Sequence, residues 1–246
     1  MSDSTVQLFV TCLVDSLFPA VGESTVRILE RQGLTVEFPY DQTCCGQPAF
    51  NAGFPEEARA MARHTVDVLH GTQGTIVVPS GSCAQMIIDH APELLREDPD
   101  YAAKANDVGA RTRELTMFLV DDLGLGDVGA RREGAIAAYH PSCHGLRGLG
   151  IRRQPLELLG AVAGLQVTEL READTCCGFG GVFSVEMPDI SAAMLTTKLN
   201  SVVDSGAGLV VAGDVGCLMH MAGGMRRRGD ATSFVHIAEL LDGTGE

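Results

Sequence analysis

Short apolar segments alternate with longer segments of helical periodicity along the whole chain. The apolar segments are too short for helices, and their runs of Val, Ile and Leu are typical of buried strands. Strands are expected at residues 6–11, 36–38 and 75–79, and again at 135–140, 165–170 and 208–212. Because short apolar strands alternate with helices, the pattern predicts parallel βαβ units.

Two of the helices are marked by their ends. Residues 21–31 have helical periodicity and are followed by Gly33, a residue type that is favoured just after a helix. A second helix opens at Pro55 with acidic residues in its first turn. Its expected buried face consists of Ala58, Met61, Ala62, Val66 and Leu69. The matching helix of the second half starts near Pro188, with an expected buried face of Ile190, Ala193, Met194 and Thr197.

The chain is an internal duplication, which its cysteines reveal. They pair at offsets of 131, 132 and 134 residues: Cys12 with Cys143, Cys44 with Cys176, and Cys83 with Cys217. The adjacent cysteines Cys45 and Cys177 pair in the same way. We therefore expect an α/β fold of two tandem Rossmann-like βαβ modules with parallel sheets, related by a pseudo-twofold duplication. The modules are expected at residues 1–126 and 135–246, with the boundary in the glycine-rich stretch 124–134.

Each half places its cysteines after successive strands. The carboxyl ends of parallel strands meet at one edge of a sheet, so four thiols per half are expected to converge there. Four thiolates suit either a tetrahedral zinc ion or an iron–sulfur cluster. The expected ligands are Cys12, Cys44, Cys45 and Cys83 in the first half, and Cys143, Cys176, Cys177 and Cys217 in the second.

The adjacent cysteines favour a cluster over a single ion. Structural zinc sites prefer Cys-x₂₋₄-Cys pairs, and neither half has one. Neighbouring cysteines reach different atoms of a larger cluster more easily than they reach one small ion. One iron–sulfur cluster per half is therefore predicted. Zinc in one or both halves, and inert core or disulfide cysteines, are the alternatives. Gly46 and Gly178, which follow the two pairs, allow the backbone to approach an inorganic core closely.

Composition and charge narrow the function classes. The net charge of −14 disfavours nucleic acid and anionic membranes as partners. No apolar stretch approaches the ~20 residues that span a bilayer, so no integral membrane segment is expected. The N-terminus lacks the pattern of a signal peptide, which predicts a cytoplasmic location. In that reducing compartment eight cysteines indicate metal binding rather than disulfides.

Three of the seven histidines lie near the cysteines of the second half. His140 and His144 flank Cys143, and His220 follows Cys217 by three residues. His140 and His220 are the candidate catalytic residues, either as hydrogen-bond donors to a cluster or as proton acceptors for a hydroxy acid. The remaining histidines are expected to be surface or packing residues, and the nearby methionines to fill the core: His64, His70, His90 and His236, and Met219, Met221 and Met225.

The spacing Cys-x₃₁-Cys-Cys-Gly-x₃₆-Cys, repeated as Cys-x₃₂-Cys-Cys-Gly-x₃₈-Cys, resembles the cysteine-rich CCG domain family. That family includes iron–sulfur subunits of heterodisulfide reductase and of glycolate oxidase. The segments Cys44-Cys45-Gly46-Gln47-Pro48-Ala49 and Gly213-Asp214-Val215-Gly216-Cys217 are similar to a branch that takes part in the bacterial oxidation of L-lactate to pyruvate.

The resemblance implies an iron–sulfur electron-transfer subunit of a cytosolic complex, not a complete enzyme alone. It implies further subunits, including a ferredoxin-type iron–sulfur protein, and a small hydroxy acid as substrate of the complex. A heterodisulfide-reductase-like or glycolate-oxidase-like subunit is one alternative, and a zinc-stabilised scaffold protein is another.

One departure from the wider family concerns the last cysteine of each half. The family pattern usually ends in Cys-x-x-Cys, whereas here Ser80 precedes Cys83 and Asp214 precedes Cys217 by three residues. The missing cysteine makes an ordinary [4Fe–4S] cluster on four cysteines the simpler expectation. Ser80 and Asp214 are either oxygen ligands or residues that cap the strand ends.

Overall fold

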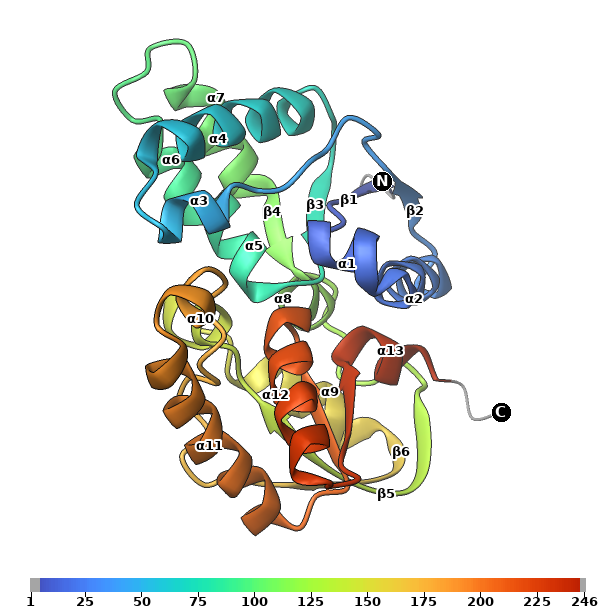
Figure 1. The fold of residues 1–246 in the computed structure, drawn as a ribbon. Coiled ribbons are helices and arrows are strands. Elements are labelled where there is room, and N and C mark those ends of the chain that lie inside the picture. Colours follow the sequence, from blue (N-terminus) through green and yellow to red (C-terminus); the bar gives the residue numbers. More distant parts are fainter. Residues whose placement is uncertain (1–4, 244–246) are drawn as a thin grey trace. The chain divides into compact units, whose positions relative to one another are not determined.

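The apolar segments form two four-stranded parallel sheets, one in each half of the chain (Figure 1). In this computed structural model residues 5–243 are described. They form two units, of which the first ends at Phe118 and the second begins at Leu119. The predicted module limits of 126 and 135 stay a prediction.

The first unit has the strand order β2-β1-β3-β4. Its strands are β1 (Thr5–Leu8), β2 (Thr35–Glu37), β3 (Thr75–Val78) and β4 (Thr112–Glu114). Its helices are α1 (Cys12–Leu17), α2 (Pro19–Arg31), α3 (Gln47–Asn51), α4 (Pro55–His70), α5 (Gly81–Gln85), α6 (Ala91–Leu94), α7 (Ala102–Arg111) and α8 (Leu115–Met117). A π-helical segment, η1 (Met86–His90), joins α5 to α6, and a second one, η2 (Phe118–Asp122), spans the unit boundary.

The second unit has the strand order β6-β5-β7-β8. Its strands are β5 (Arg131–His140), β6 (Ala163–Thr168), β7 (Leu209–Ala212) and β8 (Ser233–His236). Its helices are η3 (His144–Gly148), which is π-helical, α9 (Arg153–Ala161), α10 (Phe183–Glu186), α11 (Pro188–Ser205), α12 (Val215–Arg228) and α13 (Ile237–Asp242). The two sheets therefore have the same order of equivalent strands.

The strand registers repeat the offsets of the cysteines. Val6 lies opposite Thr75 in the first sheet, and Ala137 lies opposite Leu209 in the second. Val6 and Ala137 are 131 residues apart along the chain, and Thr75 and Leu209 are 134 apart. The cysteines that follow the same strands are separated by the same two offsets. The α/β class, the parallel sheets and the tandem duplication are thus confirmed.

Helix α4 follows the prediction from sequence closely. Pro55 lies in its first turn, where an N–H group would have no partner within the helix. Glu56 and Glu57 lie in the same turn, and their carboxylates interact favourably with the positive end of the helix dipole. Four of the five residues predicted on its inner face are buried, and Met61 is half-buried. Helix α2 ends at Arg31, and Gly33 has a φ of 80° in the following turn, as expected.

The predicted inner face of α11 is wrong. Of its four residues, Ile190, Ala193 and Thr197 are exposed and Met194 is half-buried. The buried face is instead Ser191, Leu195, Lys198, Leu199, Ser201 and Val202. Its leucines and valine share a core with Met221 and Met225 of α12, which confirms the packing role of those methionines. The prediction failed because polar residues occupy three of these six inward positions.

Strand β5 is longer than predicted, since it begins at Arg131 rather than at residue 135. Arg131 pairs with Ala163, and the register then shifts before Ala135 pairs with Leu165. Gly134 takes a φ of 70° within the irregular stretch. Among residues 5–243, none of the helices combines the length and the apolar character that crossing a bilayer requires.

Candidate metal centres

The switch point of each sheet lies between its two central strands. The chain leaves β1 toward β2 and leaves β3 toward β4, so a crevice opens between the carboxyl ends of β1 and β3. Cys12 starts α1 after β1, and Cys83 lies in α5 after β3. In the second unit Cys143 and Cys217 follow β5 and β7 in the same way. The fold therefore brings the first and last cysteine of each half together.

The Cys-Cys-Gly turns lie in the loops after β2 and β6. In each pair the second cysteine is buried, Cys45 with 3% and Cys177 with 1% of its surface exposed, and the first is half-buried. The glycines that follow have φ values of 93° at Gly46 and 90° at Gly178, a region in which only glycine is unstrained. The Gly178 N–H donates to the Sγ of Cys176 at 3.3 Å.

The four thiols of each half form one cluster. Cys12 Sγ lies 3.7 Å from Cys44 Sγ, and Cys45 hydrogen-bonds to both Cys44 and Cys83. The second half repeats this network: Cys143 hydrogen-bonds to Cys176, and Cys177 to Cys176 and Cys217. All eight cysteines are free thiols.

The thiols of a half cannot all ionise without a cation. Hydrogen bonds from Cys12 and then from Cys45 lower the pKa of Cys44 to about 2. The same hydrogen bond to Cys44, followed by burial, raises the pKa of Cys12 well above its usual value, and Cys45 is raised likewise. The second half matches, with the pKa of Cys176 lowered to about 2 and that of Cys177 raised. One thiol of each half thus loses its proton easily. The thiols with a raised pKa, Cys12 and Cys45 in the first half and Cys143 and Cys177 in the second, lose theirs when a metal compensates the charge.

This donor set fits a sulfur-ligated metal centre. In a tetrahedral zinc site with Zn–S bonds of about 2.3 Å the sulfurs are ~3.8 Å apart. The Cys12–Cys44 separation of 3.7 Å suits that geometry, whereas the adjacent cysteines favour a larger cluster. The geometry therefore supports metal binding in both halves without selecting the metal.

His140 is a fully enclosed polar group of the second half. It is fully buried, and neither ring nitrogen has a hydrogen-bond partner among the described residues. One of its ring nitrogens lies with the Sγ atoms of Cys177 and Cys217 in a group within 4.8 Å of one another. Burial, with a smaller contribution from the charge of Lys198, lowers the pKa of His140 to about 3, so the ring is neutral.

The sequence analysis missed Lys198, which is also fully buried. Its Nζ donates to the carbonyl oxygens of Glu172 at 3.0 Å and Ala173 at 3.1 Å. Glu172 is the only non-glycine residue with a positive φ among residues 5–243. Lys198 thus holds in place a strained loop that leads to Cys176. Burial lowers the pKa of Lys198. A comparison of the two halves could have identified Lys198 from the sequence. The matching position of α4 holds Thr65, so the second half has a lysine where the first half has an uncharged residue.

His220 takes a more accessible place than His140. Its Nε2 lies 3.4 Å from the Oγ of Ser191, which donates to the Gly178 carbonyl at 2.8 Å. Its ring also packs against Phe179, with 5.8 Å between centroids. Burial lowers the pKa of this half-buried histidine. His144 is half-buried at the start of η3.

The other four histidines lie outside the cysteine clusters in the roles expected of surface or packing residues. His64 contacts the Asp41 carbonyl, and His70 pairs with Asp107. His90 stacks on Phe50. His236 is buried at the end of β8, and its ring accepts from the Ala238 N–H and so caps α13.

Ser80 and Asp214 behave differently although they occupy equivalent positions. The Ser80 hydroxyl accepts from the backbone N–H of Cys83 at 3.3 Å and caps α5. Asp214 precedes α12 without capping it through its side chain, and its carboxylate is buried near His140. The capping interpretation therefore fits Ser80, whereas it does not fit Asp214.

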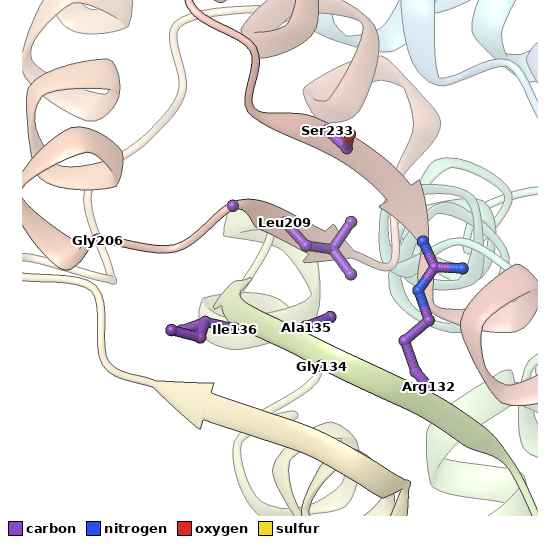
Figure 2. Close-up of a pocket in the computed structure, with 8 residues that line it drawn as sticks. Arg132, Gly134, Ala135, Ile136, Gly206, Leu209 and Ser233 are labelled. Atoms are coloured by element: carbon purple, nitrogen blue, oxygen red, sulfur yellow. The ribbon is translucent and has the colours of Figure 1, made fainter.

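A separate cavity of about 400 Å³ opens at the opposite edge of the second sheet (Figure 2). Arg132, Ile136, Leu209 and Ser233 line it near the starts of β5, β7 and β8. Cys143 and Cys217 follow the other ends of β5 and β7, so this cavity does not belong to the thiol clusters.

Comparison with known proteins gives matches over nearly the whole chain. The model of the CCG cysteine-rich domain matches twice, at residues 6–88 and 137–222. A protein named lactate utilization protein A from an Exiguobacterium species is 46% identical over 238 residues, which cover 96% of both chains. The protein of the same name from Bacillus pumilus is 45% identical over 237 residues, covering 96% of this chain and 98% of that protein.

A solved structure has a similar fold. The crystal structure of a hypothetical protein from Helicobacter pylori has a TM-score of 0.70 and covers 100% of this chain at 13% identity. The present chain spans 50% of that protein. At this identity the likeness concerns the fold alone.

Proposed function

The chain belongs to the CCG cysteine-rich domain family, among the relatives named lactate utilization protein A, and on this premise we propose that it is an iron–sulfur electron-transfer subunit of a lactate-oxidising complex. The complex oxidises L-lactate to pyruvate, and the chain acts in the cytoplasm. The observation that carries the proposal is the cluster of four thiols at the switch point of each sheet. One [4Fe–4S] cluster per half is the expected cofactor.

An iron–sulfur cluster supplies reversible one-electron transfer when it is bound. Four thiolates of each half would hold its iron atoms, and the glycine turns would bring backbone N–H groups to the sulfurs. The N–H of Gly178 already points at Cys176 in this way. Burial of Cys45 and Cys177 keeps water from one side of each site.

The electron count of the reaction calls for partner proteins. Oxidation of L-lactate to pyruvate breaks the C2–H and O–H bonds and releases two electrons and two protons. One-electron centres in this chain would carry these electrons onward and would not themselves break the C2–H bond, so a flavin or further clusters on partner proteins would be needed for that step. A partner subunit with ferredoxin-type iron–sulfur clusters is the proposed acceptor, so the chain is not a complete enzyme alone.

In this proposal His220 is the residue that exchanges a proton with the hydroxy acid. His140 is fully buried, whereas His220 is half-buried beside the second thiol cluster. Ser191 lies within reach of its Nε2 and orients the ring. His220 is therefore the proposed acceptor of the hydroxyl proton.

Zinc is the second candidate, favoured by the 3.7 Å separation of Cys12 and Cys44. A zinc ion would stabilise the fold and carry no electrons. In that case the chain would serve as a scaffold protein.

Anaerobic purification followed by iron, sulfide and zinc analysis and by EPR separates these functions. The proposal expects iron and sulfide with an EPR signal after reduction. Cys12→Ser and Cys143→Ser should each lose about half of the iron, while Ser16→Ala, on the exposed side of α1, should keep all of it. Zinc without sulfide would refute electron transfer, and unimpaired growth on L-lactate after gene disruption would refute the lactate assignment.

A further inference from the structure

The repeated strand registers identify the residue of the first half that matches His140. Val6 and Ala137 hold the same place in their sheets, so Phe9 and His140, three residues later, hold the same place as well. The Phe9 N–H donates to the Val77 carbonyl, which continues the β1–β3 pairing to this position. Both side chains are fully buried. The duplication has therefore placed a hydrocarbon ring in one half and an imidazole in the other.

The same contrast extends around the thiol clusters. Thr65 of α4 matches Lys198 of α11, because the two helices start at Pro55 and Pro188. By the offset of the last cysteines, Met86 matches His220 and Ser80 matches Asp214. In each pair the first half has an uncharged residue and the second half an ionisable one. The difference at His140 is thus part of a wider change in the second half.

His140 needs an explanation that packing does not give. A buried polar group without a hydrogen bond destabilises the folded state, and such groups are rare in native proteins. Neither ring nitrogen of His140 has a partner among the described residues, and Phe9 shows that an apolar ring fills the same position. The nearest metal-binding atoms are the sulfurs of Cys177 and Cys217, within 4.8 Å. An imidazole nitrogen at this distance from two thiolates is placed to share their metal.

We propose that His140 binds the metal centre of the second half through a ring nitrogen. The second half then has a mixed imidazole–thiolate ligand set of five donors, whereas the first has four thiolates only. This inference rests on the proposed function for the presence of an iron–sulfur centre. An imidazole ligand brings no negative charge, so the five donors of the second half carry the same four thiolate charges as the first half. The ammonium group of Lys198, which is buried and interacts with Cys177 and Cys143, favours the more negative reduced form and makes the second centre the more easily reduced of the two.

Pulsed EPR on the reduced, anaerobic holoprotein tests the ligand directly. With the Cys12→Ser variant, the signal of the second centre is observed alone. We expect a strong ¹⁴N coupling that changes to a ¹⁵N pattern when the protein is labelled with ¹⁵N-histidine. His140→Phe, which copies the first half at Phe9, should keep iron and lose the coupling. His220→Phe and His144→Phe should keep it.

The outcomes separate the inference from the function on which it rests. Iron and sulfide without a histidine coupling, or a coupling that survives in His140→Phe, would overturn the role of His140 alone. A preparation without iron would overturn the proposed function together with this inference. If His140→Phe fails to fold, His140→Gln is measured instead. It should keep iron and lose the ¹⁵N-histidine coupling, and a coupling that survives in His140→Gln would overturn the role of His140.

Discussion

Substitution of Gly178 by alanine tests whether the Cys-Cys-Gly turn holds the second thiol cluster in place. Gly178 has a φ of 90°, and a Cβ at this position would lie 2.6 Å from the Ser191 carbonyl oxygen and 3.0 Å from the Cβ of Met194. Both contacts are with α11, where the backbone is not free to move aside. The turn and the adjacent cysteines must therefore shift away from the helix.

The expected cost has two parts. A left-handed φ costs alanine about 1 kcal/mol relative to glycine. The steric contact adds about 1–3 kcal/mol, as overpacking does in other cores. Gly229 provides a matched control, since its φ is 71° but a Cβ there would meet nothing within 4 Å. Gly229→Ala should therefore show the first part of the cost alone.

Thermal unfolding and metal analysis measure both consequences. For a chain of this size each kcal/mol lowers the Tm by roughly 2–4 °C, which predicts a drop of about 4–16 °C for Gly178→Ala and about 2–4 °C for Gly229→Ala. Gly178→Ala should also lose about half of its iron, whereas Gly229→Ala should keep all of it. Equal Tm values and full iron in both variants would show that the turn does not position the cysteines.

Three further predictions concern other parts of the two sites. Ser80→Ala removes the cap of α5 and should cost about 1 kcal/mol, measured as a Tm drop of roughly 2–4 °C; an unchanged Tm would contradict the capping role. Lys198→Met leaves two loop carbonyls without their donor, so it should cost about 1–3 kcal/mol and release iron from the second half only. Full iron content in Lys198→Met would contradict that role, and Thr65→Val in the first half is its control. Removal of iron by an anaerobic chelator should lower the Tm, since metal binding stabilises the folded state, and an unchanged Tm would argue against a structural contribution.

The sequence was sufficient to predict the duplication and the two parallel sheets. The strands are short and apolar, and the cysteines follow them at offsets that the registers repeat. Convergence of the cysteines followed from one rule about the carboxyl ends of parallel strands. Helix α4 was predicted well because its inward positions are occupied mostly by apolar residues.

The prediction was less successful where polar residues point inward. The inner face of α11 was misassigned because Ser191 and Lys198 occupy buried positions that hydrophobic periodicity does not mark. Lys198 is stable there because two carbonyl oxygens satisfy its Nζ, a contact that depends on the folded loop. His140 was recognised from its place beside Cys143, but its burial and its unpartnered nitrogens required the structure.

The most direct test of the account is the iron and acid-labile sulfide content of the chain after anaerobic purification. Two [4Fe–4S] clusters predict about eight iron and about eight sulfide per chain, halved by Cys12→Ser and by Cys143→Ser. A chain that holds no iron after anaerobic reconstitution, or that holds zinc without sulfide, would contradict the account.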